Sequence, residues 1–114
     1  TWPWGERPPD CGRALLRSCG DPLQSVDAYP DGASPYGALQ MVGNAWEWVS
    51  DQYDPAYYEY APDEDPQGPD PSGLRVARGV SLYSTLWSAR PGNREFAIAT
   101  ASCPLCGVRC ALSQ

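Results

Sequence analysis

The stretch that decides the fold lies at residues 43–49 and reads Gly43-Asn44-Ala45-Trp46-Glu47-Trp48-Val49. Gly-Asn is typical of a turn, and the residues after it predict a strand over 45–49. Side chains alternate across a strand, so we expect Trp46 and Trp48 to share one face and to form part of the core. Glu47 would lie beside that core and needs a partner, because a lone buried carboxylate is costly.

Residues 1–36, upstream of this stretch, are expected to form ordered loop. The chain has 13 Pro and 11 Gly in 114 residues, and both residue types oppose long helices and long central strands. Cys11 and Cys19 lie in this part of the chain. We expect a disulfide between them in an oxidising compartment; two independent thiols are the alternative.

Downstream, the sequence predicts one long loop and two further strands. Residues 51–73 combine seven acidic residues with four tyrosines, which is typical of a surface loop whose tyrosines pack down; a site for calcium or a cationic partner is the alternative. Residues 74–82 alternate apolar and polar side chains and predict a strand. Residues 107–112 predict a closing strand.

Composition limits the classes of function. A chain of 114 residues is expected to form one domain at most. The formal net charge of −6 disfavours nucleic-acid binding, because an acidic surface repels phosphates. All eight basic residues are arginine and there is no histidine, so Ser-His-Asp catalysis within this chain is excluded. No apolar run is long enough to predict a membrane span.

Landmarks along the chain together resemble the family of the formylglycine-generating enzyme, also called sulfatase-modifying factor. That family typically reads G-N-V-W-E-W, then R-V-x-R-G-G-S-W, then G-F-R-C. The landmarks found here, in the same order, are Trp2-Pro3-Trp4-Gly5-Glu6, Ser34-Pro35-Tyr36-Gly37, Gly43-Asn44-Ala45-Trp46-Glu47-Trp48, Asp65-Pro66-Gln67-Gly68-Pro69, Arg75-Val76-Ala77-Arg78-Gly79-Val80-Ser81 and Gly107-Val108-Arg109-Cys110.

The resemblance implies an α+β fold, a variant C-type lectin fold of the formylglycine-generating-enzyme type. Such a fold is loop-rich, with a small mixed sheet and little helix. Residues 1–114 would be the C-terminal part of a single domain, and the missing N-terminal half would be a partner of this chain. An extracytoplasmic or cell-surface location is the expectation that goes with disulfide bonds.

The reaction of the family enzyme is not expected here. That enzyme oxidises a cysteine to formylglycine with copper held by two cysteines shortly after R-G-G-S. Residues 82–90 contain no cysteine, and thiolates are what select Cu(I), so we expect no copper. Another branch of the family joins this domain to a helical domain with three iron ligands, histidines among them, and makes ergothioneine-type sulfoxides. With no histidine, this chain would be an accessory portion of such an enzyme.

We therefore interpret the chain as a non-catalytic module that binds a protein or small-molecule ligand. The alternative is an oxidase of the sulfatase-modifying or non-haem iron family, or part of one, whose metal ligands come from a missing segment. Some relatives are variable proteins of diversity-generating retroelements, and residues 96–106 use only residue types that such diversification produces. The expected ligand-binding residues, with three aromatic anchors among them, are Tyr83, Ser84, Thr85, Trp87, Ser88, Phe96 and Ile98.

The resemblance also implies calcium next to the G-N-x-W-E motif. By position its ligands would be the Gln40 side chain, the carbonyls of Gly43 and Ala45, and the Glu47 carboxylate. Oxygen ligands of this kind suit a hard cation. Gln40 stands where the family usually has Asp or Asn, which should weaken the site.

The remaining cysteines and three arginines predict structural roles. Cys103 and Cys106 form a C-x-x-C pair, which without histidine is a weak zinc signal; two incidental thiols or one bridge are expected instead. One of the five cysteines must stay unpaired within the chain. The arginines expected to tie loop carbonyls and carboxylates together, with anion binding as the alternative, are Arg78, Arg94 and Arg109.

Overall fold

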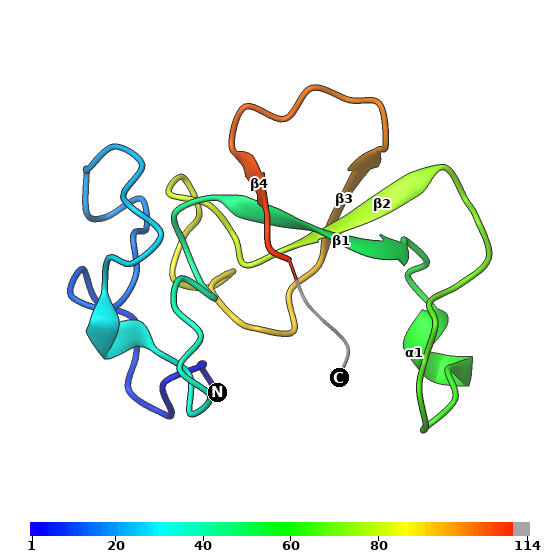
Figure 1. Cartoon of the computed structure of the whole chain (residues 1–114), viewed down its shortest axis with the longest axis horizontal. Coiled ribbons are helices and arrows are strands. Elements are labelled where there is room, and N and C mark those ends of the chain that lie inside the picture. Colours follow the sequence, from blue (N-terminus) through cyan, green and yellow to red (C-terminus); the bar gives the residue numbers. More distant parts are fainter. Residues whose placement is uncertain (111–114) are drawn as a thin grey trace.

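The computed structural model describes residues 1–110, and its centre is a four-stranded sheet (Figure 1). The strands, in the spatial order β3-β2-β1-β4, are β1 (Trp46–Gln52), β2 (Leu74–Arg78), β3 (Glu95–Ile98) and β4 (Cys106–Val108). β2 pairs antiparallel with both β1 and β3, whereas β4 pairs parallel with β1. The prediction of a small mixed sheet is therefore confirmed.

Helix is scarce in the described part of the chain. α1 (Tyr57–Tyr60) is a single turn, and η1 (Pro30–Gly32) is a 3-10 turn. η1 begins with Pro30. Proline suits this position, because the first N–H groups of a helix have no acceptor within the helix. No helix among residues 1–110 is long and apolar enough to cross a membrane. The expectation of a loop-rich chain with little helix is confirmed.

β1 forms where the central stretch predicts a strand, but its burial differs from the prediction. Trp46 packs against the core, and its backbone N–H donates to the Leu105 carbonyl at 2.8 Å. Every residue of β1 except the exposed Ser50 is only partly buried, with no alternation between the two faces. The prediction of a core face built from both indoles is wrong, because the core lies to one side of the sheet.

β2 ends at Arg78, four residues before the predicted strand end. Gly79 and Val80 both have positive φ, of 89° and 56°, which turns the backbone out of the extended region. Val80 is thereby directed into the core, where it is 1 % exposed. The turn accounts for the early end of the strand.

Three further differences concern the second half of the chain. Residues 51–73 were predicted to be loop only, yet they include the end of β1 and α1. Asp54 lies in the turn before that helix, where its Oδ1 accepts from the Ala56 N–H at 2.7 Å. β3 was not predicted at all. β4 spans only three residues, and the last two residues of the predicted closing strand, 111–112, lie outside the described part of the chain.

The core lies among loops beside the start of β1 rather than on a face of the sheet (Figure 1). It joins the N-terminal loops, the bend before β1 and the loop after β2. Its buried residues are Ala14, Leu16, Val42, Val80 and Ala89. Loops can form a core here because disulfide bonds and hydrogen bonds link them, in place of helices and strands.

Disulfides supply two of those links. Cys11 and Cys19 are bonded, as predicted, and they close the loop that carries Ala14 and Leu16. Cys103 and Cys106 form a second bridge, which was one of the two outcomes left open. Cys110 is a free, exposed cysteine.

Candidate functional site

Asn44, in the central stretch, connects three loops. Its side-chain amide pairs with the backbone of Gln24, accepting at 3.0 Å and donating at 3.1 Å. Its own N–H donates to the Leu15 carbonyl, and its carbonyl accepts from the Leu82 N–H, both at 2.9 Å. Its φ is 67°, a conformation that Asn tolerates better than most residues. This role of Asn44 was not predicted, although Gly-Asn at a turn was the available signal.

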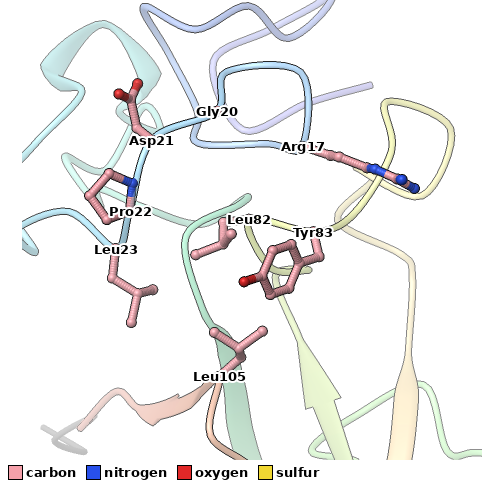
Figure 2. Close-up of a pocket in the computed structure, with 8 residues that line it drawn as sticks. All are labelled: Arg17, Gly20, Asp21, Pro22, Leu23, Leu82, Tyr83 and Leu105. Atoms are coloured by element: carbon pink, nitrogen blue, oxygen red, sulfur yellow. The ribbon is translucent and has the colours of Figure 1, made fainter.

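The loops connected by Asn44 surround a cavity of about 880 Å³ (Figure 2). Figure 2 shows the Tyr83 hydroxyl directed toward the leucines that line the cavity, while the charged groups of Arg17 and Asp21 turn away from them. The apolar lining consists of Leu23, Leu82, Leu105 and the ring of Tyr83. An apolar surface with one phenol suits a small molecule that has an apolar part and a polar group.

A second cavity, of about 360 Å³, shares Arg17 with the first. The backbone N–H of Arg17 donates to the Ser84 carbonyl at 3.2 Å, which fixes the two loops together. Ser84, Thr85 and Trp87 line this cavity, and Trp87 is 85 % exposed. Tyr83 in the first cavity and these three residues in the second therefore lie on one short segment.

The other three predicted ligand-binding residues line neither of these two cavities. Ser88 completes the turn, since its Oγ donates to the Thr85 carbonyl at 3.0 Å. Phe96 lies on β3 and stacks on Tyr53, with ring centroids 4.2 Å apart. Ile98, also on β3, is 60 % exposed. The structure thus brings together four of the seven residues.

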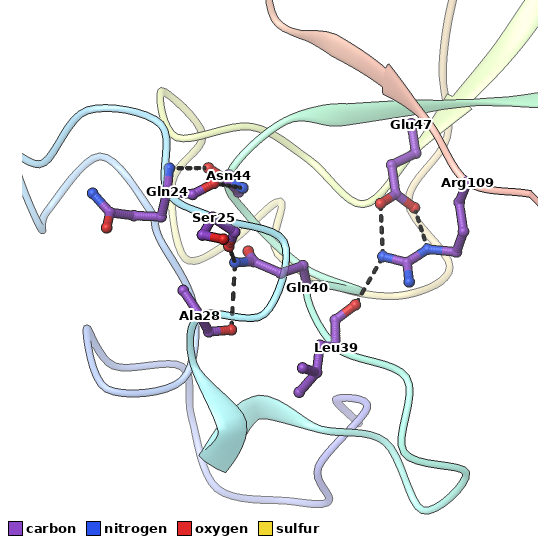
Figure 3. Close-up of polar contacts among 8 residues, drawn as sticks. All are labelled: Gln24, Ser25, Ala28, Leu39, Gln40, Asn44, Glu47 and Arg109. Carbon is purple, nitrogen blue, oxygen red and sulfur yellow. Dashed lines mark hydrogen bonds and ion pairs between the residues drawn. The ribbon is translucent and has the colours of Figure 1, made fainter.

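The four residues predicted to bind calcium line one cavity of about 300 Å³. Gln40 is buried, and its amide Nε2 donates to the carbonyls of Ser25 at 2.7 Å and Ala28 at 3.4 Å (Figure 3). Its Oε1 is buried without a hydrogen-bond partner among the described residues. The other three predicted calcium ligands are Gly43 and Ala45, in the turn before β1, and Glu47 on β1.

Glu47 has a protein partner that the sequence analysis did not assign to it. Arg109 holds its carboxylate with two hydrogen bonds, from Nε at 2.9 Å and from Nη2 at 2.7 Å (Figure 3). The same Nη2 also donates to the Leu39 carbonyl at 2.8 Å. The hydrogen bond to Glu47 raises the pKa of the Arg109 guanidinium. Such a bidentate pair is among the stronger polar contacts in proteins.

The structural role predicted for the three arginines is confirmed. Arg78 donates to the Pro91 carbonyl at 2.9 Å and to the Tyr58 hydroxyl. Arg94 donates to the Asp54 carbonyl at 3.0 Å. Each of them, like Arg109, donates to the carbonyl of a loop residue.

The donor set does not fit the copper centre of the family enzyme. Four of the five cysteines are in disulfides, and residues 82–90, where the copper ligands would lie, contain none. Within residues 1–110 no group of three or more cysteine or carboxylate side chains could hold a metal ion. A calcium site of the predicted kind would depend on carbonyl and amide oxygens with a single carboxylate.

Comparison with known proteins identifies the family. The sulfatase-modifying factor enzyme 1-like domain matches residues 2–114. The chain is 36 % identical over 97 residues to the hercynine oxygenase of Mycolicibacterium smegmatis, which covers 80 % of this chain and 22 % of that protein. It is 46 % identical over 46 residues to the formylglycine-generating enzyme of Streptomyces coelicolor, covering 40 % and 15 %. It is 39 % identical over 75 residues to the serine/threonine-protein kinase pkn1 of Chlamydia caviae, covering 60 % and 12 %.

These relatives correct the interpretation of the chain as a non-catalytic binding module. Two relatives that align with 80 % and 83 % of the chain are both named hercynine oxygenase, and an oxygenase is an enzyme. The lack of cysteine in residues 82–90 concerns one reaction of the family and not the others, which is where that interpretation was wrong. Nothing in the structure tests the retroelement hypothesis that was attached to it.

The family match extends over all but the first residue of the chain, although the chain spans 22 % of the length of the first relative. Its motifs also have structural roles here. The G-N-x-W-E-W motif starts β1 and connects the loops around the larger cavity, and the G-V-R-C motif supplies β4 and the Arg109 pair. The chain therefore belongs to the sulfatase-modifying factor enzyme 1-like family.

Proposed function

We propose that this chain is the C-terminal part of a domain, with a variant C-type lectin fold, in an oxygenase similar to the hercynine oxygenases. The observation that carries the proposal is the 36 % identity over 80 % of the chain. Iron, when bound in such an oxygenase, supplies the activation of oxygen. Its ligands would come from a part of the protein outside this sequence, because the chain has no histidine.

In this proposal the chain supplies one wall of the substrate site. The 880 Å³ cavity is the candidate, since its leucines would exclude water from the substrate's apolar part. The Tyr83 hydroxyl, directed toward that cavity, would donate or accept a hydrogen bond and so orient the substrate. Arg17 also lines the cavity, and its guanidinium would pair with a substrate carboxylate if the side chain turned inward.

Oxygen consumption by the whole protein that carries this chain tests the proposal. The iron-loaded protein is expected to consume oxygen only when hercynine and a thiol are present. Tyr83→Phe should lower kcat/KM by roughly 3–10-fold, the equivalent of one lost hydrogen bond. Tyr36→Phe is the matched control, since Tyr36 is 97 % exposed and lines none of the cavities described. Oxygen uptake that does not depend on hercynine would overturn the proposal.

We also propose that the 300 Å³ cavity binds calcium. The buried Gln40 Oε1 without a partner supports the fit, and the Glu47 carboxylate keeps lone pairs beyond those used by Arg109. Calcium at 100 times its Kd should stabilise the chain by about 2.7 kcal/mol. Gln40→Met, which keeps the volume and removes the oxygen, should abolish that gain. An unfolding free energy that calcium leaves unchanged in the unmodified chain would refute the site.

A further inference from the structure

The disulfide between Cys103 and Cys106 closes the turn that leads into β4. Within this turn the Cys106 N–H donates to the Cys103 carbonyl at 3.1 Å. Cys106 is also the first residue of β4, where it lies opposite Trp46 of β1. The bridge therefore joins the loop that follows β3 to an edge strand of the sheet, and the proposed function does not use it.

Little besides the bridge holds Cys103 in its place. Residues 98–102, which precede it, are all exposed, and so is Pro104 after it. In Figure 1 the loop from β3 to β4 arches beyond the ends of these strands. With the bridge open, no buried side chain of this loop would keep Cys103 beside Cys106. The bridge should then re-form only slowly, which favours its reduction.

The bridge between Cys11 and Cys19 has different surroundings. Three residues inside its loop are at most 2 % exposed, and they are Ala14, Leu15 and Leu16. The Cys19 N–H also donates to the Leu16 carbonyl at 2.9 Å. Core packing would therefore keep these two thiols close together after reduction, and thiols held in proximity re-form their bond readily. Of the two bridges, Cys103–Cys106 is expected to be the more easily reduced.

Leu105 connects this bridge to the wall of the larger cavity. It lies between the two bridged cysteines and lines that cavity together with Tyr83 (Figure 2). Its carbonyl accepts from the Trp46 N–H at 2.8 Å. β4 has only three residues and β1 is its one neighbour in the sheet, so few hydrogen bonds hold this strand. Opening the bridge should therefore loosen Leu105.

We propose that the Cys103–Cys106 disulfide reacts reversibly with small-molecule thiols, and that its redox state controls how firmly Leu105 is held in the cavity wall. A thiolate attacks one sulfur of the bridge, forms a mixed disulfide and releases the other cysteine as a thiolate. A second thiol then displaces the first. Two small thiols thus become one small disulfide, and their two electrons and two protons convert the bridge into two cysteine thiols. This exchange does not require oxygenase activity, so its failure would leave the proposed function unaffected.

Equilibration with glutathione and glutathione disulfide tests the site in the whole protein that carries this chain. Free thiols are then alkylated, and mass spectrometry measures the reduced fraction of each cysteine pair. Half reduction of Cys103–Cys106 should need a ratio of [glutathione]² to [glutathione disulfide] at least roughly 10-fold lower than half reduction of Cys11–Cys19. Cys110→Ser keeps both bridges and should change neither ratio. Equal ratios, or a higher ratio for Cys103–Cys106, would overturn the proposal.

Hydrogen exchange tests whether the bridge controls the cavity wall. At a glutathione ratio that leaves the other bridge intact, reduction should speed exchange of the Trp46 amide by roughly 10-fold or more, because its acceptor is the Leu105 carbonyl. The control is the Tyr53 amide, which donates to the Leu74 carbonyl at 2.8 Å just beyond the other end of β1 and should not change. An unchanged Trp46 amide in the reduced protein would also overturn the proposal.

A variant that cannot form the bridge completes the test. Cys103→Ser combined with Cys106→Ser should show fast exchange at Trp46 without any thiol, and glutathione should not change it further. Protection of the Tyr53 amide checks that the variant is folded. Slow exchange at Trp46 in the folded variant contradicts the proposal, and if the variant does not fold, the reduced unmodified protein decides.

Discussion

Arg109 ties the end of the described chain to β1 through the Glu47 carboxylate and the Leu39 carbonyl. Arg109→Ala should lower the free energy of unfolding by about 1–2 kcal/mol, a discounted value because the Arg109 side chain is 39 % exposed. Arg109→Lys should recover less than half of this, since an ammonium cannot form the bidentate pair. Urea unfolding measures both.

Arg90→Ala is the control for these variants. Its side chain is exposed and has no recorded partner within residues 1–110, so the change should stay within about 0.5 kcal/mol. An Arg109→Ala effect no larger than the Arg90→Ala effect would show that the pair does not contribute to stability.

The pair of Tyr60 and Asp54 predicts how α1 responds to pH. The hydrogen bond raises the pKa of Tyr60 to about 12, so its contribution is complete below the ordinary value of 10.0 and is lost as pH rises through about 12. The same bond lowers the pKa of Asp54, so that contribution is complete above the ordinary value of 3.8 and is lost as pH falls. Tyr60→Phe should remove a tyrosine ionisation step near pH 12 from an ultraviolet titration. A titration curve that keeps this step in the variant would assign it elsewhere.

The end of β2 depends on a residue that is unusual for its backbone conformation. Val80 has a φ of 56° although β-branched side chains rarely adopt that region, and it stands where the family motif R-G-G-S has its second glycine. Both Val80→Ala and Val80→Gly remove buried methyl groups, but only glycine removes the strain. We expect Val80→Gly to be at least as stable as Val80→Ala in urea unfolding.

Val76 provides the matched comparison for this reversal. It is 2 % exposed and lies in the regular part of β2, where glycine should be less stable than alanine by about 0.5–1 kcal/mol. If glycine is less stable than alanine by the same amount at positions 76 and 80, the strain at Val80 does not affect stability.

The elements show why part of the fold was predictable and part was not. β1 and the first residues of β2 follow from local alternation and turn residues, which a sequence displays. The end of β2 depends on two positive φ values and β3 on its pairing with β2, so both are properties of the folded chain. α1 is a single turn without a side-chain cap, too short to leave a periodic pattern.

The two disulfides should differ in how much they stabilise the whole molecule. Cys11–Cys19 closes a loop with a sequence separation of 8, and Cys103–Cys106 one with a separation of 3. Loop-closure entropy gives roughly 2.5 kcal/mol for the first and roughly 1.7 kcal/mol for the second. The double Ser variants, each made with Cys110→Ser to prevent exchange, should lower the unfolding free energy in that order. The reverse order would mean that strain, not loop length, decides.

At the scale of the molecule, the candidate sites were predictable only as lists of residues. The calcium set shares one cavity as the family resemblance implies, and Tyr83 to Trp87 lie together because they are close in sequence. The larger cavity instead combines segments that are far apart along the chain, which are connected by Asn44 and by the hydrogen bond from Arg17 to the Ser84 carbonyl. That Phe96 and Ile98 lie on a strand could not be predicted for the same reason, since β3 depends on its pairing with β2.

The parallel pairing of β4 with β1 has a consequence for biosynthesis. Glu47 leaves the ribosome 62 residues before Arg109, its partner, can do so. At ordinary translation rates the nascent chain would wait about 3–12 s with this edge of β1 unpaired. Co-translational completion of this edge of the sheet therefore waits for residues 106–109.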